Sequence, residues 1–174
     1  GPSGLAAALA AGQTGARVIL ADEQNEFGGA LLGGRDEIDS VPALDWVAQT
    51  IRHLEGMMEV TLLPRTTVFG YFNHNFLAAV ERVTDHLGES DNRLPRQKIW
   101  RIRARQVLLA TGAIERPMVF EGNDRPGVML AAAARTYVNR YAVRLAERPI
   151  VFTNNDGAYH TAIDLAAAGA KVSV

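Results

Sequence analysis

The chain of 174 residues contains no cysteine. This absence excludes disulfide bonds, Cys-ligated zinc or iron–sulfur centres and the dithiol chemistry of flavin disulfide reductases within these residues. It also fits a reducing compartment, so a cytoplasmic location is expected. Neither sign of charge is in excess, because 18 lysines and arginines are balanced by 19 acidic residues. No global field therefore attracts nucleic acid or an anionic membrane surface, and neither is expected as a partner.

Long apolar runs are missing as well. No stretch approaches the roughly 18 residues of a membrane span, and the first residues lack the charged region that begins a signal peptide. In contrast, 48% of the residues are hydrophobic and 21% are charged, which is typical of a folded domain with a real core. We therefore expect a soluble, intracellular α/β protein.

The first residues follow the order glycine loop, helix, strand, carboxylate. Gly1 and Gly4 precede an Ala/Leu-rich helix, and the segment over 17–23 then predicts a short buried strand that ends in Asp22 and Glu23. This order matches the second half of a dinucleotide-binding unit, G-x-G-x-x-G with an acid about 20 residues later. The first glycine and its strand are absent, so we expect the chain to be a fragment.

Each residue of this half-motif has a physical role in nucleotide binding. Gly1 would be the second glycine, where the missing side chain lets the backbone approach a pyrophosphate. Gly4 would be the third, where the helix packs closely on its strand. The helix N-terminus offers free N–H groups and the positive end of its dipole to the phosphates. Asp22, with Glu23 beside it, is placed to accept hydrogen bonds from ribose hydroxyls.

A second copy of the pattern lies near the other end of the chain. Gly15-Ala16-Arg17-Val18 recurs as Gly169-Ala170-Lys171-Val172, preceded by an Ala-rich helix and by an expected strand over 149–153. Its loop is degenerate, because side chains obstruct the backbone and Asp156 would repel a phosphate. We do not expect this copy to hold a pyrophosphate. The residues at its three glycine positions are Thr153, Asn155 and Ala158.

The middle of the chain predicts an antiparallel β-meander over about 59–104, after a scaffold helix over 41–55. Its strands are expected over 59–63, 66–71, 76–82 and 98–104, with a polar loop over 88–92. In the last strand apolar residues alternate with arginines, which indicates a half-exposed strand. We interpret the arginine row as a solvated face or a contact to another chain rather than a nucleic-acid patch. These arginines are Arg101, Arg103 and Arg105.

Two glycine-containing segments are candidates for further contacts with a nucleotide. Phe27-Gly28-Gly29 follows the acidic strand end, and an apolar strand over 107–113 ends in Ala110-Thr111-Gly112. No acid–base pair, metal-ligand spacing or nucleophile elbow is present in the sequence, so no catalytic or metal-binding residues are expected. Any chemistry would belong to a cofactor or to another domain.

Together these patterns predict an α/β protein with a Rossmann-like FAD/NAD(P)-binding fold, a parallel sheet plus an antiparallel β-meander, truncated at both ends. Residues 1–148 would form the first dinucleotide-binding domain, and residues 149–174 would begin a second, Rossmann-like domain.

Longer motifs resemble one family in particular. The segments over 109–117, 123–131 and 151–156 are similar to the alpha subunit of heterotetrameric sarcosine oxidase, within the two-dinucleotide-domain flavoprotein superfamily. The half-motif over 1–4, the acidic strand end over 22–24, the double glycine over 27–29 and the Ala-Thr-Gly triplet agree with that resemblance. It covers essentially all of this chain but a minor part of such a subunit.

The resemblance implies a function and a set of binding residues. These oxidases demethylate sarcosine to glycine, reduce oxygen to hydrogen peroxide and pass the one-carbon unit to tetrahydrofolate, giving methylenetetrahydrofolate. The amine is oxidised at FAD in the beta subunit, FMN lies at the alpha–beta interface, and gamma and delta subunits complete the complex. The alpha subunit's fold would hold NAD. The implied cofactor-binding residues are Gly1, Pro2, Ser3, Gly4, Asp22, Glu23, Gln24, Gly28, Gly29, Val68, Ala110, Thr111 and Gly112.

Two alternatives remain open from the sequence. The chain could be the FAD-bearing subunit of a related opine or secondary-amine dehydrogenase, because NAD and FAD share the ADP half that these residues would contact. It could also be a non-catalytic interaction module with a Rossmann-like fold, whose arginine row binds a partner.

Overall fold

The computed structural model describes residues 1–88 and 93–174. Most of the polar loop expected over 88–92, namely residues 89–92, therefore lies outside the described residues. The chain divides into two compact units: Gly1–Gly29 with Leu44–Thr111, and Ala30–Ala43 with Gly112–Val174. The domain boundary expected after residue 148 stays a prediction.

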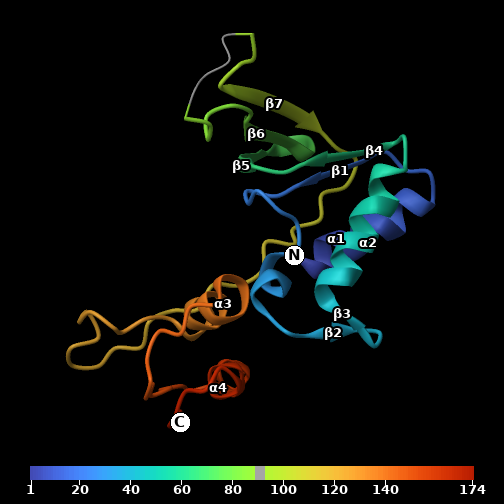
Figure 1. Cartoon of the computed structure of the whole chain (residues 1–174). Coiled ribbons are helices and arrows are strands. Elements are labelled where there is room, and N and C mark those ends of the chain that lie inside the picture. Colours follow the sequence, from blue (N-terminus) through green and yellow to red (C-terminus); the bar gives the residue numbers. More distant parts are fainter. Residues whose placement is uncertain (89–92) are drawn as a thin grey trace. The chain divides into compact units, whose positions relative to one another are not determined.

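The first unit contains a parallel pair of strands with its helices (Figure 1). Helix α1 (Pro2–Gln13) packs on strand β1 (Val18–Ala21), which pairs in parallel with β4 (Val60–Leu63). Helix α2 (Ala43–Glu55) connects the two strands along the chain. A crossover through a helix is the usual way to join parallel strands. The predicted helix, strand and carboxylate order is thus present, but β1 is not buried as predicted, since Ile19 is 39% exposed.

Helix α2 forms where the apolar spacing predicts it, but it starts two residues late. Val47 and Leu54 are buried and are spaced to share one helix face. The first two predicted positions instead form β3 (Val41–Pro42), which pairs antiparallel with β2 (Glu37–Ile38) in the second unit. Pairing with a neighbouring strand here prevails over the helical tendency of the sequence.

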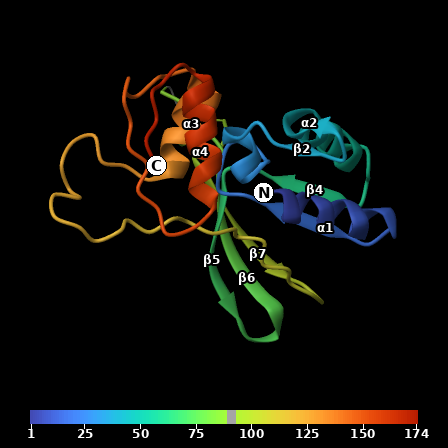
Figure 2. The same cartoon turned by 90° about the horizontal axis from the view of Figure 1, so that it is seen from below.

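The predicted meander is a three-stranded antiparallel sheet in the order β5 (Thr66–Phe72), β6 (Phe76–Arg82), β7 (Gln97–Arg103). The strand expected over 59–63 is not part of it, because that segment forms β4 and pairs in parallel with β1. Figure 2 shows the three strands side by side. The short turn η2 (Asn73–Asn75) joins the first two strands. A register shift in β5 between Val68 and Gly70 marks a bulge. The sequence predicted each of these strands to within a residue or two.

The second unit is built on two helices, α3 (Ala131–Tyr141) and α4 (Gly157–Ala167), which pack against each other. The short turn η1 (Gly29–Gly33) leads into this unit from the chain's first part. Helix α4 is the Ala-rich helix of the predicted second copy, whereas α3 was not predicted. Small apolar residues form the core: Val138, Val151, Ala158, Ala162, Leu165 and Ala170.

Two predicted strands differ from the structure. The segment over 107–113 is extended coil, and its Leu108 and Leu109 side chains are 67% and 69% exposed. The segment over 149–153 makes a single parallel bridge, from Ile150 to Ser173. A strand needs hydrogen-bonding neighbours as well as an apolar pattern, and the described residues place none beside the first of these segments.

Candidate dinucleotide site

The N-terminus of α1 carries no side-chain cap. Pro2 occupies the first turn, where its missing N–H costs nothing, and no side chain caps the helix. The first intrahelical bond runs from the Leu5 N–H to the Gly1 carbonyl oxygen over 3.1 Å. A Cβ atom at Gly1 would meet nothing within 4 Å. Free N–H groups beside a bare backbone suit the approach of a phosphate. The exposed Ser3 lies in this same first turn.

Gly4 packs α1 closely against its neighbours. A Cβ atom there would lie 3.4 Å from the Ala110 Cβ and 3.6 Å from the Leu20 Cδ1. This is the close helix–strand packing expected of the third glycine in a dinucleotide motif. It also brings Ala110, from the predicted Ala-Thr-Gly segment, to the start of the helix.

Asp22 lies at the end of β1 and faces the same helix N-terminus. Its backbone N–H donates to the Leu63 carbonyl oxygen over 3.1 Å, which continues the pairing with β4. Its Oδ1 accepts from the Gln24 N–H at 3.0 Å, and its Oδ2 lies 3.6 Å from the Gly1 nitrogen. The carboxylate is therefore held beside the glycine where a pyrophosphate would lie.

The start of the meander fixes the backbone around this carboxylate. The Thr66 N–H donates to the Asp22 carbonyl oxygen over 2.8 Å, and the Arg65 N–H donates to the Gln24 carbonyl oxygen over 2.8 Å. Arg82 Nη2 donates to the Glu23 carbonyl oxygen over 2.9 Å. These bonds leave the carboxylate of Glu23 exposed. The backbone of the acidic strand end is thus held by hydrogen bonds, while the Asp22 side chain is 18% exposed.

The double glycine completes the set of residues around Gly1. Gly28 and Gly29 have φ values of 136° and 58°, which glycine adopts far more readily than other residues. A Cβ atom at Gly29 would lie only 2.7 Å from the Gly1 Cα. The predicted turn is therefore present and rests directly on the helix start.

The structure brings some of the predicted site residues together and not others. Within the first unit, Gly1 and Gly4 lie near Asp22, Gly29 and Ala110. Within the described part of the chain, no hydrogen bond connects this group to three further predicted residues. These residues are Val68, Thr111 and Gly112. Val68 lies on β5 and is 43% exposed, and Gly112 belongs to the second unit.

The degenerate second loop is held by its own side chains. Thr153 Oγ1 accepts from the Asn155 N–H at 3.1 Å, and Asn155 Oδ1 accepts from the Gly157 N–H at 3.0 Å. Asp156 stands at the N-cap of α4. The N–H groups of Asn155 and Gly157 are thus bonded within the loop itself.

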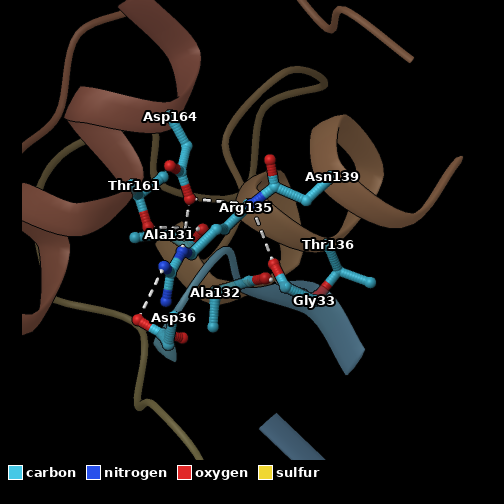
Figure 3. Close-up of polar contacts among 9 residues, drawn as sticks. All are labelled: Gly33, Asp36, Ala131, Ala132, Arg135, Thr136, Asn139, Thr161 and Asp164. Carbon is cyan, nitrogen blue, oxygen red and sulfur yellow. Dashed lines mark hydrogen bonds and ion pairs between the residues drawn. The ribbon is translucent and has the colours of Figure 1, made fainter. Parts of the chain in front are cut away.

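A buried polar cluster in the second unit was missed by the sequence analysis (Figure 3). Arg135 Nε donates to Asp164 Oδ2 over 2.6 Å, and Arg135 Nη2 donates to Asp36 Oδ1 over 3.3 Å. Asn139 Nδ2 donates to the same Asp164 oxygen over 2.7 Å and to the Gly33 carbonyl oxygen over 3.0 Å. The cluster ties α3 to α4 and to the segment after η1.

The charges in this cluster stabilise each other. Burial opposes ionisation of Asp164, but the hydrogen bonds from Arg135 and Asn139 outweigh it and lower the pKa of the carboxyl group. Burial likewise opposes the charge on Arg135, yet the bonds to Asp164 and Asp36 raise the pKa of its guanidinium. One signal was available in the sequence: Asp164 is a lone acid in an Ala-rich helix, where an unpaired charge would be costly.

Neither a metal site nor a membrane span is found among the described residues. They bring together no group of three side chains suited to holding a metal ion. Of the helices over 1–88 and 93–174, none has both the length and the apolar character required to cross a lipid bilayer.

The fold matches that of a solved dehydrogenase. Over 99% of this chain, the structure is similar to the crystal structure of L-proline dehydrogenase from P. horikoshii, with a TM-score of 0.77 and 24% identity, and it covers 33% of that protein. The chain therefore has the mixed α/β fold of that protein, with parallel and antiparallel sheets as predicted. No family model matches the chain.

Comparison with curated relatives identifies the family more closely. The chain is 52% identical to the sarcosine oxidase alpha subunit of Rhizobium meliloti over 99% of its length and 51% identical to that of a Corynebacterium species over all of it. It spans 17% and 18% of these relatives. One of the opine oxidase subunits of Rhizobium meliloti is 32% identical over 87% of the chain, which covers 28% of that relative. Along its whole length, then, the chain is homologous to part of the sarcosine oxidase alpha subunits, and the predicted resemblance is confirmed.

Proposed function

We propose that this chain is the dinucleotide-binding part of an alpha subunit of the sarcosine oxidase type. The observation that carries the proposal is the convergence of the uncapped α1 N-terminus, the open face of Gly1 and the Asp22 carboxylate. A dinucleotide needs amide donors for its phosphates, a bare backbone beside them and an acceptor for its ribose. The first two requirements fit Gly1–Gly4, and the third fits Asp22.

The proposal assigns roles to the surrounding residues. The first turn of α1 would hold the pyrophosphate, with Gly28 and Gly29 forming the opposite wall. Asp22 and Glu23 would accept from the ribose hydroxyls, and Gln24 would fix the turn behind them. Val68 would contact the adenine, and Ala110–Gly112 would lie at the same end of the ligand. We propose NAD as the ligand, with FAD as the alternative.

The complex would oxidise the secondary amine sarcosine to glycine with oxygen and tetrahydrofolate, yielding hydrogen peroxide and methylenetetrahydrofolate. The flavins would carry the redox chemistry, with FAD in the beta subunit, while FMN would lie at the alpha–beta interface. This chain contributes no catalytic side chain and acts by binding a nucleotide within an assembly that includes beta, gamma and delta subunits. The cytoplasm is its proposed location.

The opine oxidase relatives support a second candidate, in which the same site would hold FAD in an enzyme for other secondary amines. To decide, the complete subunit is purified, its nucleotide is released by heat and the product is identified by absorbance and chromatography. Colourless NAD, together with sarcosine-dependent peroxide formation by the assembled complex, supports the first function. Yellow FAD supports the second. A subunit that releases nothing contradicts both and favours a non-catalytic interaction module.

A further inference from the structure

One face of the meander carries arginines and aromatic rings side by side. In the sheet register Arg103 is paired with Phe76, which is paired with Phe72, and Arg101 is paired with Ala78 in the next row. Cross-strand partners in a sheet project to the same side. Ile99 belongs to this face as well, because it is two residues from Arg101 along β7. We call this set, Phe72, Phe76, Ile99, Arg101 and Arg103, the arginine face.

The opposite face of the sheet is buried at its centre. Leu77 and Ala79 on β6 are 8% and 0% exposed, and their partners on β7 are Ile102 and Trp100. Ala78, which lies on the arginine face, is 9% exposed, so the centre of the sheet is covered on both faces. The exposed residues of the arginine face lie at its other positions.

The apolar part of the arginine face is exposed. Phe72 is 54% exposed and Ile99 is 61% exposed. The rings of Phe72 and Phe76 are 5.9 Å apart, and the Phe72 ring lies over Gly70, where it occupies the space that a side chain would need. The bulge in β5 and this glycine thus let an aromatic ring lie along the outside of the sheet.

The arginines of this face have no acidic partner among the described residues. Arg101 and Arg103 are exposed, and no ion pair or side-chain hydrogen bond joins either of them, or the neighbouring Arg105, to another described side chain. By contrast, Lys98 on the opposite face lies 4.1 Å from the Trp100 ring centre, next to Glu81 in the register. The three arginines, which lie within five residues, form a local positive surface on a chain of net charge −1.

We propose that the arginine face is the docking surface for a carboxylate-bearing surface of another subunit. Protein interfaces are enriched in arginine and in aromatic residues and depleted of lysine and acidic residues, which is the composition of this face. Exposed guanidinium groups favour carboxylate partners, because they bind them in a bidentate geometry. A nucleic acid fits less well, since the chain as a whole carries no positive field. This proposal shares one premise with the proposed function, on which it rests: the chain works within a multi-subunit complex.

The first test uses charge reversal in the complete complex. The double variant Arg101→Glu/Arg103→Glu should weaken association with the partner subunit by about tenfold or more, measured by light scattering after size exclusion. A matched variant, Arg52→Glu/Arg148→Glu, makes the same change in net charge at two exposed arginines elsewhere and should assemble normally. Nucleotide content is measured in each preparation and should stay unchanged. Normal assembly of the first variant would overturn the proposal and leave the arginines as a means of keeping an edge strand in solvent.

A second test does not depend on the charge-reversed variant folding. Ile99 is replaced by the photoreactive p-benzoylphenylalanine in an otherwise unchanged complex, and the cross-linked peptides are identified by mass spectrometry. The proposal expects a cross-link to an Asp- or Glu-rich segment of another subunit. Cross-links confined to this chain, to nucleic acid or to nothing would overturn it. A subunit without nucleotide that still gives the expected cross-link would refute the proposed function and leave the docking surface standing.

Discussion

Gly29 packs directly on Gly1, so closely that a Cβ atom at Gly29 would lie 2.7 Å from the Gly1 Cα. Two glycines far apart in the sequence thus meet at the start of α1. The contact explains why the double glycine follows the acidic strand end. It brings the backbone of the 27–29 turn to the place where we propose that the pyrophosphate lies.

Replacing Gly29 by alanine should disturb this contact. The residue has a φ of 58°, so a side chain would cost about 1–2 kcal/mol in backbone strain alone, and it would also collide with Gly1. We expect the turn to move away from α1 and the complete subunit to lose much of its bound nucleotide. Gly88→Ala is the control, because a Cβ atom there meets nothing within 4 Å and its φ is not positive. Equal nucleotide content in both variants would contradict the role of the turn.

We expect dinucleotide binding to depend on the charge of Asp22 more than on its shape. Asp22→Ala removes both the proposed ribose acceptor and the bond to the Gln24 N–H, whereas Asp22→Asn can keep that bond through its amide oxygen. We expect both variants to retain dinucleotide more weakly, with a thermal midpoint near that of the wild type for the asparagine variant. Equilibrium dialysis with the complete subunit measures the loss, and Glu55→Ala serves as an acidic control on α2. Unchanged retention in Asp22→Ala would exclude the ribose role.

The Arg135 cluster should stabilise the second unit. Arg135→Met leaves Asp164 without its ion-pair partner while the carboxylate stays only 10% exposed. We expect a loss of about 2 kcal/mol, less than for a fully buried pair because Arg135 is itself 19% exposed. Hydrogen exchange of the α3 and α4 amides in the complete subunit reports this loss. The double variant Arg135→Met/Asp164→Leu should recover part of it, since no buried charge remains unpaired. Exchange that stays at the wild-type rate in Arg135→Met would contradict the assignment.

The same cluster should give the second unit a defined acid sensitivity. The pKa of Asp164 is lowered in the folded state, so its stabilisation is complete above the pKa of an unfolded aspartate, about 3.9, and is lost as pH falls through the lower folded value. Arg135 adds no dependence there, because its guanidinium is protonated throughout. Hydrogen exchange as a function of pH should show destabilisation of α4 below about pH 4 in the wild type. A flatter profile is expected for Asp164→Asn, and identical profiles would argue against this pair as the cause.

Local patterns predicted most of the first unit and less of the second. The helix over α1, the carboxylate after β1 and the strands β5 to β7 follow from glycine spacing and alternation, which act over a few residues. Helix α3 and the Arg135–Asp164 pair were not predicted, because that pair depends on contacts 29 residues apart. The segment over 107–113 has the composition of a strand, yet hydrogen-bonding partners cannot be found from composition.

The site shows the same division between local and long-range information. The close packing of Gly4 on its strand was predicted, because it is part of the motif itself, whereas the contact of Gly4 with Ala110 was not. The Gly1–Gly29 contact was foreseen only as a turn near a ligand. The hydrogen bond to the Glu23 carbonyl oxygen comes from the side chain of Arg82, 59 residues away, and nothing in the local sequence indicates it.

The most direct test of the account compares the dinucleotide content of the complete subunit with that of its Gly1→Val variant. A Cβ atom at Gly1 meets no atom within 4 Å, so we expect valine to leave the fold intact and to fill the space proposed for the pyrophosphate. The account predicts bound dinucleotide in the wild type and about one equivalent less per subunit in the variant, with unchanged circular dichroism. Equal nucleotide content in the two proteins, or none in the wild type, would contradict it.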